Sequence, residues 1–246
     1  MTSQTETQTT SAHILAGMAE GGVDLGISER FFSGPGVFVE VGAARPEFLS
    51  VSAHFRSLGW RIIAIEPIPE FCELQRQAGH DVLQFACGEV DQDDVDFTVV
   101  NSHENAYEDG TVSFESFSSL SVKPKFSALK PGLDKRTIKV NVRRLDTILK
   151  QHAPDVGQID VLSVDTEGWE MEVLRGLDFL RNRPKVMVIE NFFYEKSYRQ
   201  FARSKGYTLW RVYPPNDVYV ANELLSTRER MVAAGRRVAR KMRHRR

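Results

Sequence analysis

The fold of this chain is decided by the stretch Val37-Phe38-Val39-Glu40-Val41-Gly42-Ala43-Ala44. Its apolar residues predict a buried strand, and its glycine predicts a tight turn, where a backbone without a Cβ can approach a ligand closely. Helix-like sequence follows over residues 47–58, and a second apolar run over residues 61–65 stops at Glu66. Strand, glycine turn, helix, strand and acid together predict a nucleotide-binding half of an open α/β sheet. In such a half, the acid accepts hydrogen bonds from ribose hydroxyls.

Beyond this stretch, apolar runs continue to alternate with amphipathic, helix-like segments. Further strands are predicted over residues 81–86, 95–100, 137–142, 159–164, 185–189, 207–212 and 218–221. Helices are predicted over residues 12–27, 69–78, 145–150, 169–176 and 198–205, and a solvated acidic turn over residues 89–96. The pattern predicts a Rossmann-like α/β fold with a mostly parallel seven-stranded sheet, an antiparallel closing strand and helices on both faces.

The composition fits one globular domain with an addition at each terminus. At 246 residues the chain can bury one full core, and its net charge is −1. Residues 226–246 hold nine Lys and Arg residues and one acid, which leaves an acidic body. Such a body argues against broad nucleic-acid binding, which depends on neutralising phosphates. We expect a flexible or helical extension over residues 1–30, an α/β domain over residues 31–222, and a basic amphipathic tail over residues 223–246.

The expected location is the cytoplasm. The N-terminal segment lacks the basic and apolar regions of a secretory signal, and no apolar run approaches the roughly 20 residues of a membrane span. Cys72 and Cys87 are too few for a disulfide framework and lack metal-ligand spacing, so we expect reduced thiols. The tail suits peripheral contact with the anionic inner membrane surface or an acidic partner, and a solvated extension is the alternative.

The predicted strands end in acidic side chains at one edge of the sheet. The strand ends carry, in order, Glu40 with Gly42, Glu66, Ala86 with Cys87, Asp165 with Glu167, and Glu190. A single acid at a strand end is usually a helix cap or part of a solvated turn. Several neighbouring carboxylates repel one another unless a cationic or hydroxyl-rich ligand lies among them. Because ligands of open α/β sheets bind at these ends, the repetition predicts a ligand site.

The turn after the first strand narrows the choice of ligand. It lacks Gly-x-Gly-x-x-Gly, which argues against a pyrophosphate cradle for NAD or FAD, and the chain has no Gly-x-x-x-x-Gly-Lys for a P-loop. A cofactor with adenosine, no phosphates and a positive sulfonium suits an acid-rich edge. S-adenosylmethionine is that cofactor.

Ordered motifs along residues 36–222 carry a family resemblance. They are Val37–Ala43, Ala64–Pro69, Ala86–Gly88, Ser118–Leu120, Val142–Leu149, Ile159–Glu170 and Val188–Glu190. In this order they resemble the FkbM family of S-adenosylmethionine-dependent methyltransferases. The resemblance implies a Rossmann-like class I methyltransferase fold. It also implies an O-methyltransferase that acts on a hydroxyl of a sugar, a glycan or a related secondary metabolite.

The resemblance also implies a set of cofactor contacts by position. Glu40, Gly42 and Ala43 are expected to line the methionine and ribose part of the cofactor. Glu66 is expected to hold the ribose hydroxyls, and Ala86-Cys87 to flank the adenine. Glu40 stands where the family commonly has Asp, and it keeps the carboxylate.

Three acids are expected at the reacting end of the site. Asp165 is expected nearest the transferred methyl, as a contact of the cofactor, with Glu167 and Glu190 beside the acceptor hydroxyl. An alcohol needs a base, and we expect Asp165 in that role, with a nearby histidine as the alternative. A divalent metal held by Asp165 and Glu190 is a further alternative, which no histidine-rich motif supports. Trp169 is expected to pack its helix onto the sheet.

Two other functions remain open at this level. The basic tail prompts nucleic-acid methylation, but the segment after the strand at 159–164 begins Asp165-Thr166-Glu167 rather than Asp/Asn-Pro-Pro-Tyr/Phe. The other is a non-catalytic binding protein that keeps the fold, which the acids at the strand ends argue against. We expect a small-molecule or glycan acceptor and no nucleic acid, with residues 101–135 forming the acceptor loop.

Overall fold

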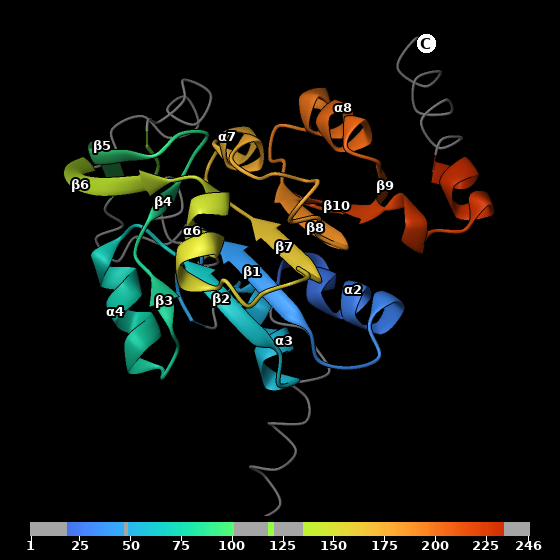
Figure 1. Ribbon diagram of the computed structural model, residues 1–246, viewed down its shortest axis with the longest axis horizontal. Helices are drawn as coiled ribbons and strands as arrows, with labels where there is room; N and C mark the ends of the chain where they lie inside the picture. The colour runs from blue at the N-terminus through green and yellow to red at the C-terminus, as the bar shows by residue number, and fades with distance from the viewer. Residues whose placement is uncertain (1–18, 47–48, 101–117, 121–134, 234–246) are drawn as a thin grey trace, which may run out of the picture.

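A seven-stranded sheet forms the centre of the protein, whose computed structural model describes residues 19–46, 49–100, 118–120 and 135–233 (Figure 1). Its strands are β1 (Val37–Val41), β2 (Arg61–Ile65), β3 (Val82–Leu83), β7 (Val161–Val164), β8 (Val186–Glu190), β9 (Tyr207–Tyr213) and β10 (Asn216–Ala221). They lie in the order β3-β2-β1-β7-β8-β10-β9. Strand β10 is antiparallel to both of its neighbours, while the other pairs are parallel. The predicted mostly parallel sheet with an antiparallel closing strand is confirmed.

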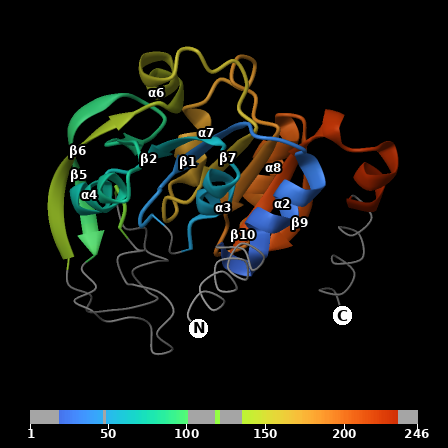
Figure 2. The ribbon, with the colours of Figure 1, turned by 90° about the horizontal axis from the view of Figure 1, so that it is seen from below.

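Helices cover both faces of this sheet, as the sequence predicts. They are η1 (Glu20–Gly22), α2 (Val23–Phe31), α3 (Val51–Ser57), α4 (Pro69–Gln77), α6 (Leu145–His152), α7 (Glu170–Arg175), α8 (Lys196–Ser204) and η3 (Asn222–Leu224). Figure 2 shows α6 on one side of the sheet and α2 with α3 on the other. Side-chain alternation in β1 explains the two layers, because Phe38 packs among residues of α2 and α3, and Val39 packs among residues of α6, α7 and α8.

A second, three-stranded sheet closes one end of the molecule. It consists of β4 (Ala86–Cys87), β5 (Gln92–Val100) and β6 (Lys135–Arg143), in the order β4-β6-β5. The prediction of a single strand over residues 81–86 is therefore wrong: β3 pairs with β2, whereas β4 pairs with β6. The N–H of Phe85 donates to the carbonyl of Leu83 at 3.1 Å, which turns the chain between the two pairings. The apolar residues continue through this turn, so their pattern does not reveal the change of sheet.

The acidic run at residues 89–96 is partly strand rather than only a solvated turn, because β5 begins at Gln92. Its acids are exposed and pair with bases of the neighbouring strand β6. A carboxylate oxygen of Asp93 lies 2.5 Å from a guanidinium nitrogen of Arg143, and a carboxylate oxygen of Asp96 lies 2.7 Å from Nζ of Lys139. A strand whose face is open to water carries charged residues, and this obscures the alternation by which strands are predicted.

Helix α3 begins at Val51, later than the sequence predicts. Leu49 has a φ of 58°, which lies outside the helical region. Ser50 caps the helix, because its hydroxyl accepts the N–H of Ala53 at 3.2 Å. The helix therefore does not start near Pro46, where the sequence predicts it. The other helix predicted to start at a proline, α4, does begin at Pro69.

Helix α2 belongs to the core, and its Val23 and Ile27 are fully buried beside α3. It begins later than the predicted first helix, after Gly21 and Gly22, whose φ values of 64° and 68° are left-handed. Parts of several predicted segments lie outside the described residues: the N-terminal extension with the start of its helix (1–18), the start of the helix predicted over residues 47–58 (47–48), the acceptor loop (101–117 and 121–134) and the tail (234–246). Within the described ranges, every helix is too short or too polar to span a bilayer.

Candidate active site

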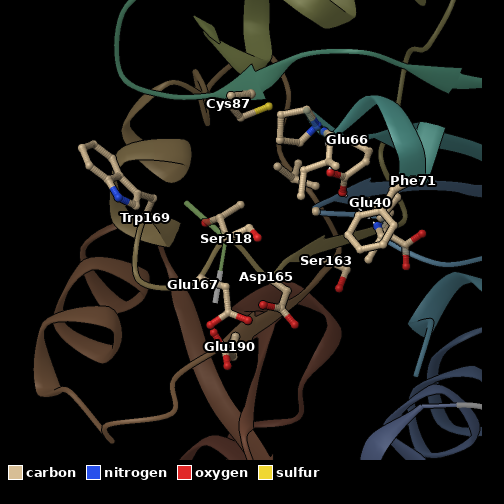
Figure 3. A pocket seen from close by; sticks show the side chains of 18 of the residues that line it. Glu40, Glu66, Phe71, Cys87, Ser118, Ser163, Asp165, Glu167, Trp169 and Glu190 are labelled. Atoms are coloured by element: carbon tan, nitrogen blue, oxygen red, sulfur yellow. Dashed lines mark hydrogen bonds between the residues drawn. The ribbon is translucent and has the colours of Figure 1, made fainter. Parts of the chain in front are cut away.

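A cavity of about 410 Å³ opens at the carboxyl ends of β2, β1, β7 and β8, with the second sheet as a further wall (Figure 3). These four strands are neighbours, so the acids at their ends meet, as the sequence pattern predicts. The cavity wall contains every residue predicted for the site: Glu40, Gly42, Ala43, Glu66, Ala86, Cys87, Asp165, Glu167 and Glu190. Figure 3 shows Asp165, Glu167 and Glu190 together at one end, which we call the acid end.

Glu66 joins the turns that follow β1 and β2. Its buried carboxylate accepts the N–H of Ala44 at 2.9 Å and the N–H of Ile68 at 2.8 Å. Burial raises the pKa of Glu66 to about 7, although the two N–H donors oppose the rise. Each oxygen uses one of its two lone pairs in these bonds, so the carboxylate can accept two further hydrogen bonds from a ligand.

The wall near Glu66 is apolar and forms the other end of the cavity, which we call the apolar end. Ile68, Phe71 and Ala86 pack there in one buried cluster between α4 and the second sheet. Cys87 is also buried, and burial raises the pKa of its thiol, which makes it unsuited to act as a nucleophile. Sequence reasoning missed Ile68 and Phe71, because apolar residues at a helix start carry no signal that separates a ligand contact from core packing.

The glycine of the first turn is required by the protein itself. Gly42 has a φ of 84°, and a Cβ at this position would lie 1.8 Å from the carbonyl oxygen of Asp165. The close approach between the ends of β1 and β7 therefore excludes a side chain at residue 42. The neighbouring strand is thus a sufficient reason for this glycine, and the close approach of a ligand to Gly42 stays a prediction.

Glu40 lies in the cavity wall, and its carboxylate holds the start of α3. It accepts the hydroxyl of Ser52 at 2.6 Å, the N–H of Ser52 at 3.2 Å and the hydroxyl of Ser50 at 3.4 Å. Burial raises the pKa of Glu40, and these hydrogen bonds and the charge of Arg56 oppose the rise. This acid therefore has a clear role in holding the helix, whatever else it contacts.

The acid end brings the carboxyl groups of Asp165 and Glu190 close together. One oxygen of each lies within 4.8 Å of the other. Burial raises the pKa of Glu190 well above its usual value, with Asp165 as the next cause. Glu190 therefore keeps a proton to a higher pH than an ordinary glutamate.

Asp165 itself titrates near neutral pH. Burial raises its pKa to about 7, and the charges of Glu170 and Glu20 add to the rise. Asp165 has a large solvent-accessible area, but this area faces the cavity rather than the outer surface. The surrounding protein therefore still shields its charge from bulk water. The pKa of Glu167 is also raised, by burial and then by Asp165. A carboxylate with a pKa near 7 is well suited to general-base chemistry.

Sequence reasoning missed the role of Glu170, the first residue of α7. Its buried carboxylate accepts four hydrogen bonds, from the N–H and hydroxyl of Thr166, the N–H of Gly168 and the hydroxyl of Tyr198. An acid in the first turn of a helix is common, so its position alone carries no signal. Trp169 was expected to pack its helix onto the sheet, but it is half-buried and lines the cavity.

The acids at this end are close enough to be considered for a metal. One carboxylate oxygen each of Asp165, Glu170 and Glu190 lies within 4.8 Å of the others. Both oxygens of Glu170, however, already accept hydrogen bonds. The raised pKa of Glu190 also favours a proton on its carboxyl group, which a cation bound there would have to displace.

The match to a known family extends over most of the sheet. The sequence profile described as the methyltransferase FkbM domain matches residues 40–209, from β1 into β9. The chain belongs to the FkbM methyltransferase family. This confirms the family resemblance carried by the motifs at the strand ends, and the protein is a methyltransferase with the fold expected for it. A search of curated proteins finds no match to this chain.

The matched region of this methyltransferase contains both ends of the cavity. It includes Glu40 and Glu66, the second-sheet residues Ala86 and Cys87, and the whole acid end. Glu20 of η1, which also lines the cavity, precedes the matched region. Pro215 and Asn216, at the start of β10, line the cavity as well and follow the matched region.

Proposed function

We propose that this methyltransferase moves a methyl group from S-adenosylmethionine to a hydroxyl of a sugar, a glycan or a related secondary metabolite. The observation that carries the proposal is the two-ended cavity. At one end, Glu66 has acceptor capacity to spare beside an apolar wall, which suits a ribose and a purine ring. At the other end, several carboxyl groups suit a cation. When bound, S-adenosylmethionine supplies a methyl group on a positively charged sulfur.

The residues at the two ends of the cavity would bind the cofactor in a single orientation. Glu66 would accept the two ribose hydroxyls, and Ala86 and Cys87 would lie against the adenine, opposite Phe71. Glu40, Gly42 and Ala43 lie in the wall between the two ends and would line the ribose and methionine part. Asp165 would then lie nearest the positive sulfur, where its negative charge is stabilised.

In the proposed reaction, Asp165 acts as the general base. Asp165 would take the proton of the acceptor hydroxyl as its oxygen forms the new C–O bond, while the C–S bond to the methyl group would break and leave the neutral thioether S-adenosylhomocysteine. Glu190, whose raised pKa keeps it protonated, would donate a hydrogen bond to the nearby carboxylate of Asp165 and hold it in place. Glu167 lies at the same end and would accept a hydrogen bond from the acceptor. Alignment of the oxygen with the methyl group supplies much of the rate.

The charge of the cavity supports a hydroxylated acceptor over a nucleic acid. Among the described residues that line it, six are acidic and Arg45 is basic. Arg45 lies over the ring of Phe71, with its guanidinium carbon 5.4 Å from the ring centre, at the apolar end. An acceptor that brings phosphate groups to the acid end would meet several carboxylates, which would repel it.

Calorimetric titration with S-adenosylmethionine and S-adenosylhomocysteine tests the cofactor. We expect both to bind the native protein and Glu66→Ala to weaken binding by about 100-fold, since a buried charged acceptor for two hydroxyls is lost. Glu70→Ala is the matched control, because Glu70 is an exposed acid on α4 that pairs with Arg136. Lack of binding by the folded native protein, or equal affinities in the two variants, would contradict the proposal. Labelled methyl transfer to a panel of sugars then tests the acceptor class.

A further inference from the structure

The turn between β7 and α7 has a backbone that needs support. Glu167 and Gly168 have φ values of 55° and 95°, so two successive residues adopt left-handed conformations. For a non-glycine residue such a conformation costs about 1 kcal/mol or more, and it persists only where surrounding contacts enforce it. This turn carries Asp165 and Glu167 into the cavity, so whatever enforces its conformation also places these two carboxylates.

The contacts that enforce the turn converge on one carboxylate. Oε1 of Glu170 accepts the N–H of Gly168 at 2.9 Å, the N–H of Thr166 at 3.0 Å and the Thr166 hydroxyl at 3.3 Å. Oε2 accepts the hydroxyl of Tyr198 from α8 at 2.7 Å. Glu170 is 1% exposed, so these four donors take the place of water around its charge.

We propose that Glu170 is the positioning residue of the active site, whose buried carboxylate fixes the turn that presents Asp165 and Glu167 to the cavity. Tyr198 completes the arrangement by tying Glu170 to α8. The inference rests on the proposed function, because that function makes Asp165 the general base. The hydrogen bonds of Glu170 themselves are present in the ligand-free protein. Glu170 makes no contact with the reacting groups in this role and acts through the turn.

The alternative is that Glu170 only stabilises the fold. The two roles differ in their effect on Asp165, because the charge of Glu170 raises the pKa of Asp165. The other charges that act on Asp165 come from Glu20 of η1 and Glu40 of β1, and the carboxyl group of Glu190 of β8 lies beside it. All of these remain in a variant that changes residue 170 alone.

Four variants separate geometry from charge. Glu170→Ala removes every acceptor of the turn, and Glu170→Gln keeps an oxygen for the backbone N–H groups while it removes the charge. Tyr198→Phe removes one donor and keeps the charge. Glu172→Gln is the matched control, since it removes a carboxylate from the same helix that makes none of the four hydrogen bonds. Two quantities are measured: affinity for S-adenosylhomocysteine by calorimetry, and the titration midpoint of Asp165 by ¹³C NMR, assigned with Asp165→Asn.

We expect Glu170→Ala to weaken S-adenosylhomocysteine binding at least tenfold, and Glu170→Gln to restore most of that affinity. Both variants should lower the titration midpoint of Asp165 by about one pH unit, because a neighbouring negative charge is gone. Tyr198→Phe should weaken binding several-fold without lowering the midpoint. Glu172→Gln should match the native protein in both measurements.

A folded Glu170→Ala protein with native affinity, or an Asp165 midpoint that neither variant at residue 170 changes, would overturn the inference. If Glu170→Ala does not fold, Glu170→Gln and Tyr198→Phe carry the same test through the midpoint and the affinity. Failure of the native protein to bind S-adenosylhomocysteine would contradict the proposed function instead. The titration of Asp165 in the ligand-free protein would still decide the role of Glu170.

Discussion

At the scale of single residues, Glu66 shows how one carboxylate can serve both the fold and a ligand. Its two oxygens accept backbone N–H groups from the turns after β1 and β2, which fixes the rim of the cavity. The two remaining acceptor positions are then held ready for a ligand. Burial disfavours the charged form of this carboxylate and raises the pKa of Glu66 to about 7.

The raised pKa of Glu66 predicts how the stability of the folded protein depends on pH. The folded state holds a proton on Glu66 that the unfolded chain has lost between pH 4.5 and about 7. The stabilising contribution of this proton is therefore complete below pH 4.5 and disappears as the pH rises through about 7. A shift of this size corresponds to about 3 kcal/mol.

Urea unfolding of the ligand-free protein between about pH 5 and pH 8 measures the effect. We expect native protein to lose about 2.5 kcal/mol more than Glu66→Gln over this range, since glutamine does not titrate. Asp165 and Glu190 shift in the same direction, but they are present in both proteins. Parallel pH profiles for the two proteins would show that Glu66 is not responsible.

At the scale of elements, the start of α3 depends on polar side chains from two places in the chain. Ser50 caps the helix, and Glu40 of β1 accepts both the N–H and the hydroxyl of Ser52. The helix therefore begins where these acceptors are, rather than at Pro46. Glu40 ends a strand and also binds the start of a helix. It therefore fixes the position of α3 relative to the sheet at the edge of the cavity.

We expect Ser52→Ala to destabilise the protein by about 1–3 kcal/mol, because the buried carboxylate of Glu40 loses its shortest hydrogen bond. Ser57→Ala is the matched control from the same helix, since Ser57 is exposed and donates to the carbonyl of His54. That change should cost less than about 0.5 kcal/mol. Chemical denaturation of both variants checks the prediction, which an equal loss of stability would contradict.

At the scale of the whole molecule, the parallel sheet explains why much of the site could be predicted from the sequence. Strands buried on both faces are continuous apolar runs, so β1, β2 and β8 are visible in the sequence, together with the acids that end them. Once these strands are neighbours in one sheet, Glu66, Asp165 and Glu190 must share an edge. No contact needs to be known for that conclusion.

The rest of the molecule depends on contacts that no local pattern records. The chain changes sheets at Phe85 within a continuous apolar stretch, and exposed acids hide the beginning of β5, whose residues 95–100 are predicted as a strand. Glu170 is an ordinary acid in a helix start until Tyr198, 28 residues away in the chain, is seen to donate to it. Phe71 lines the cavity only because α4 packs against the second sheet.

A crystal structure of the protein with S-adenosylhomocysteine would show whether the cavity binds the cofactor in the proposed orientation. We expect the ribose hydroxyls at hydrogen-bond distance, about 2.7 Å, from the carboxylate of Glu66. We also expect the adenine against Ala86 and Phe71, and the sulfur at the acid end beside Asp165. A ligand bound in the opposite orientation, or bound outside this cavity, would contradict the proposed function.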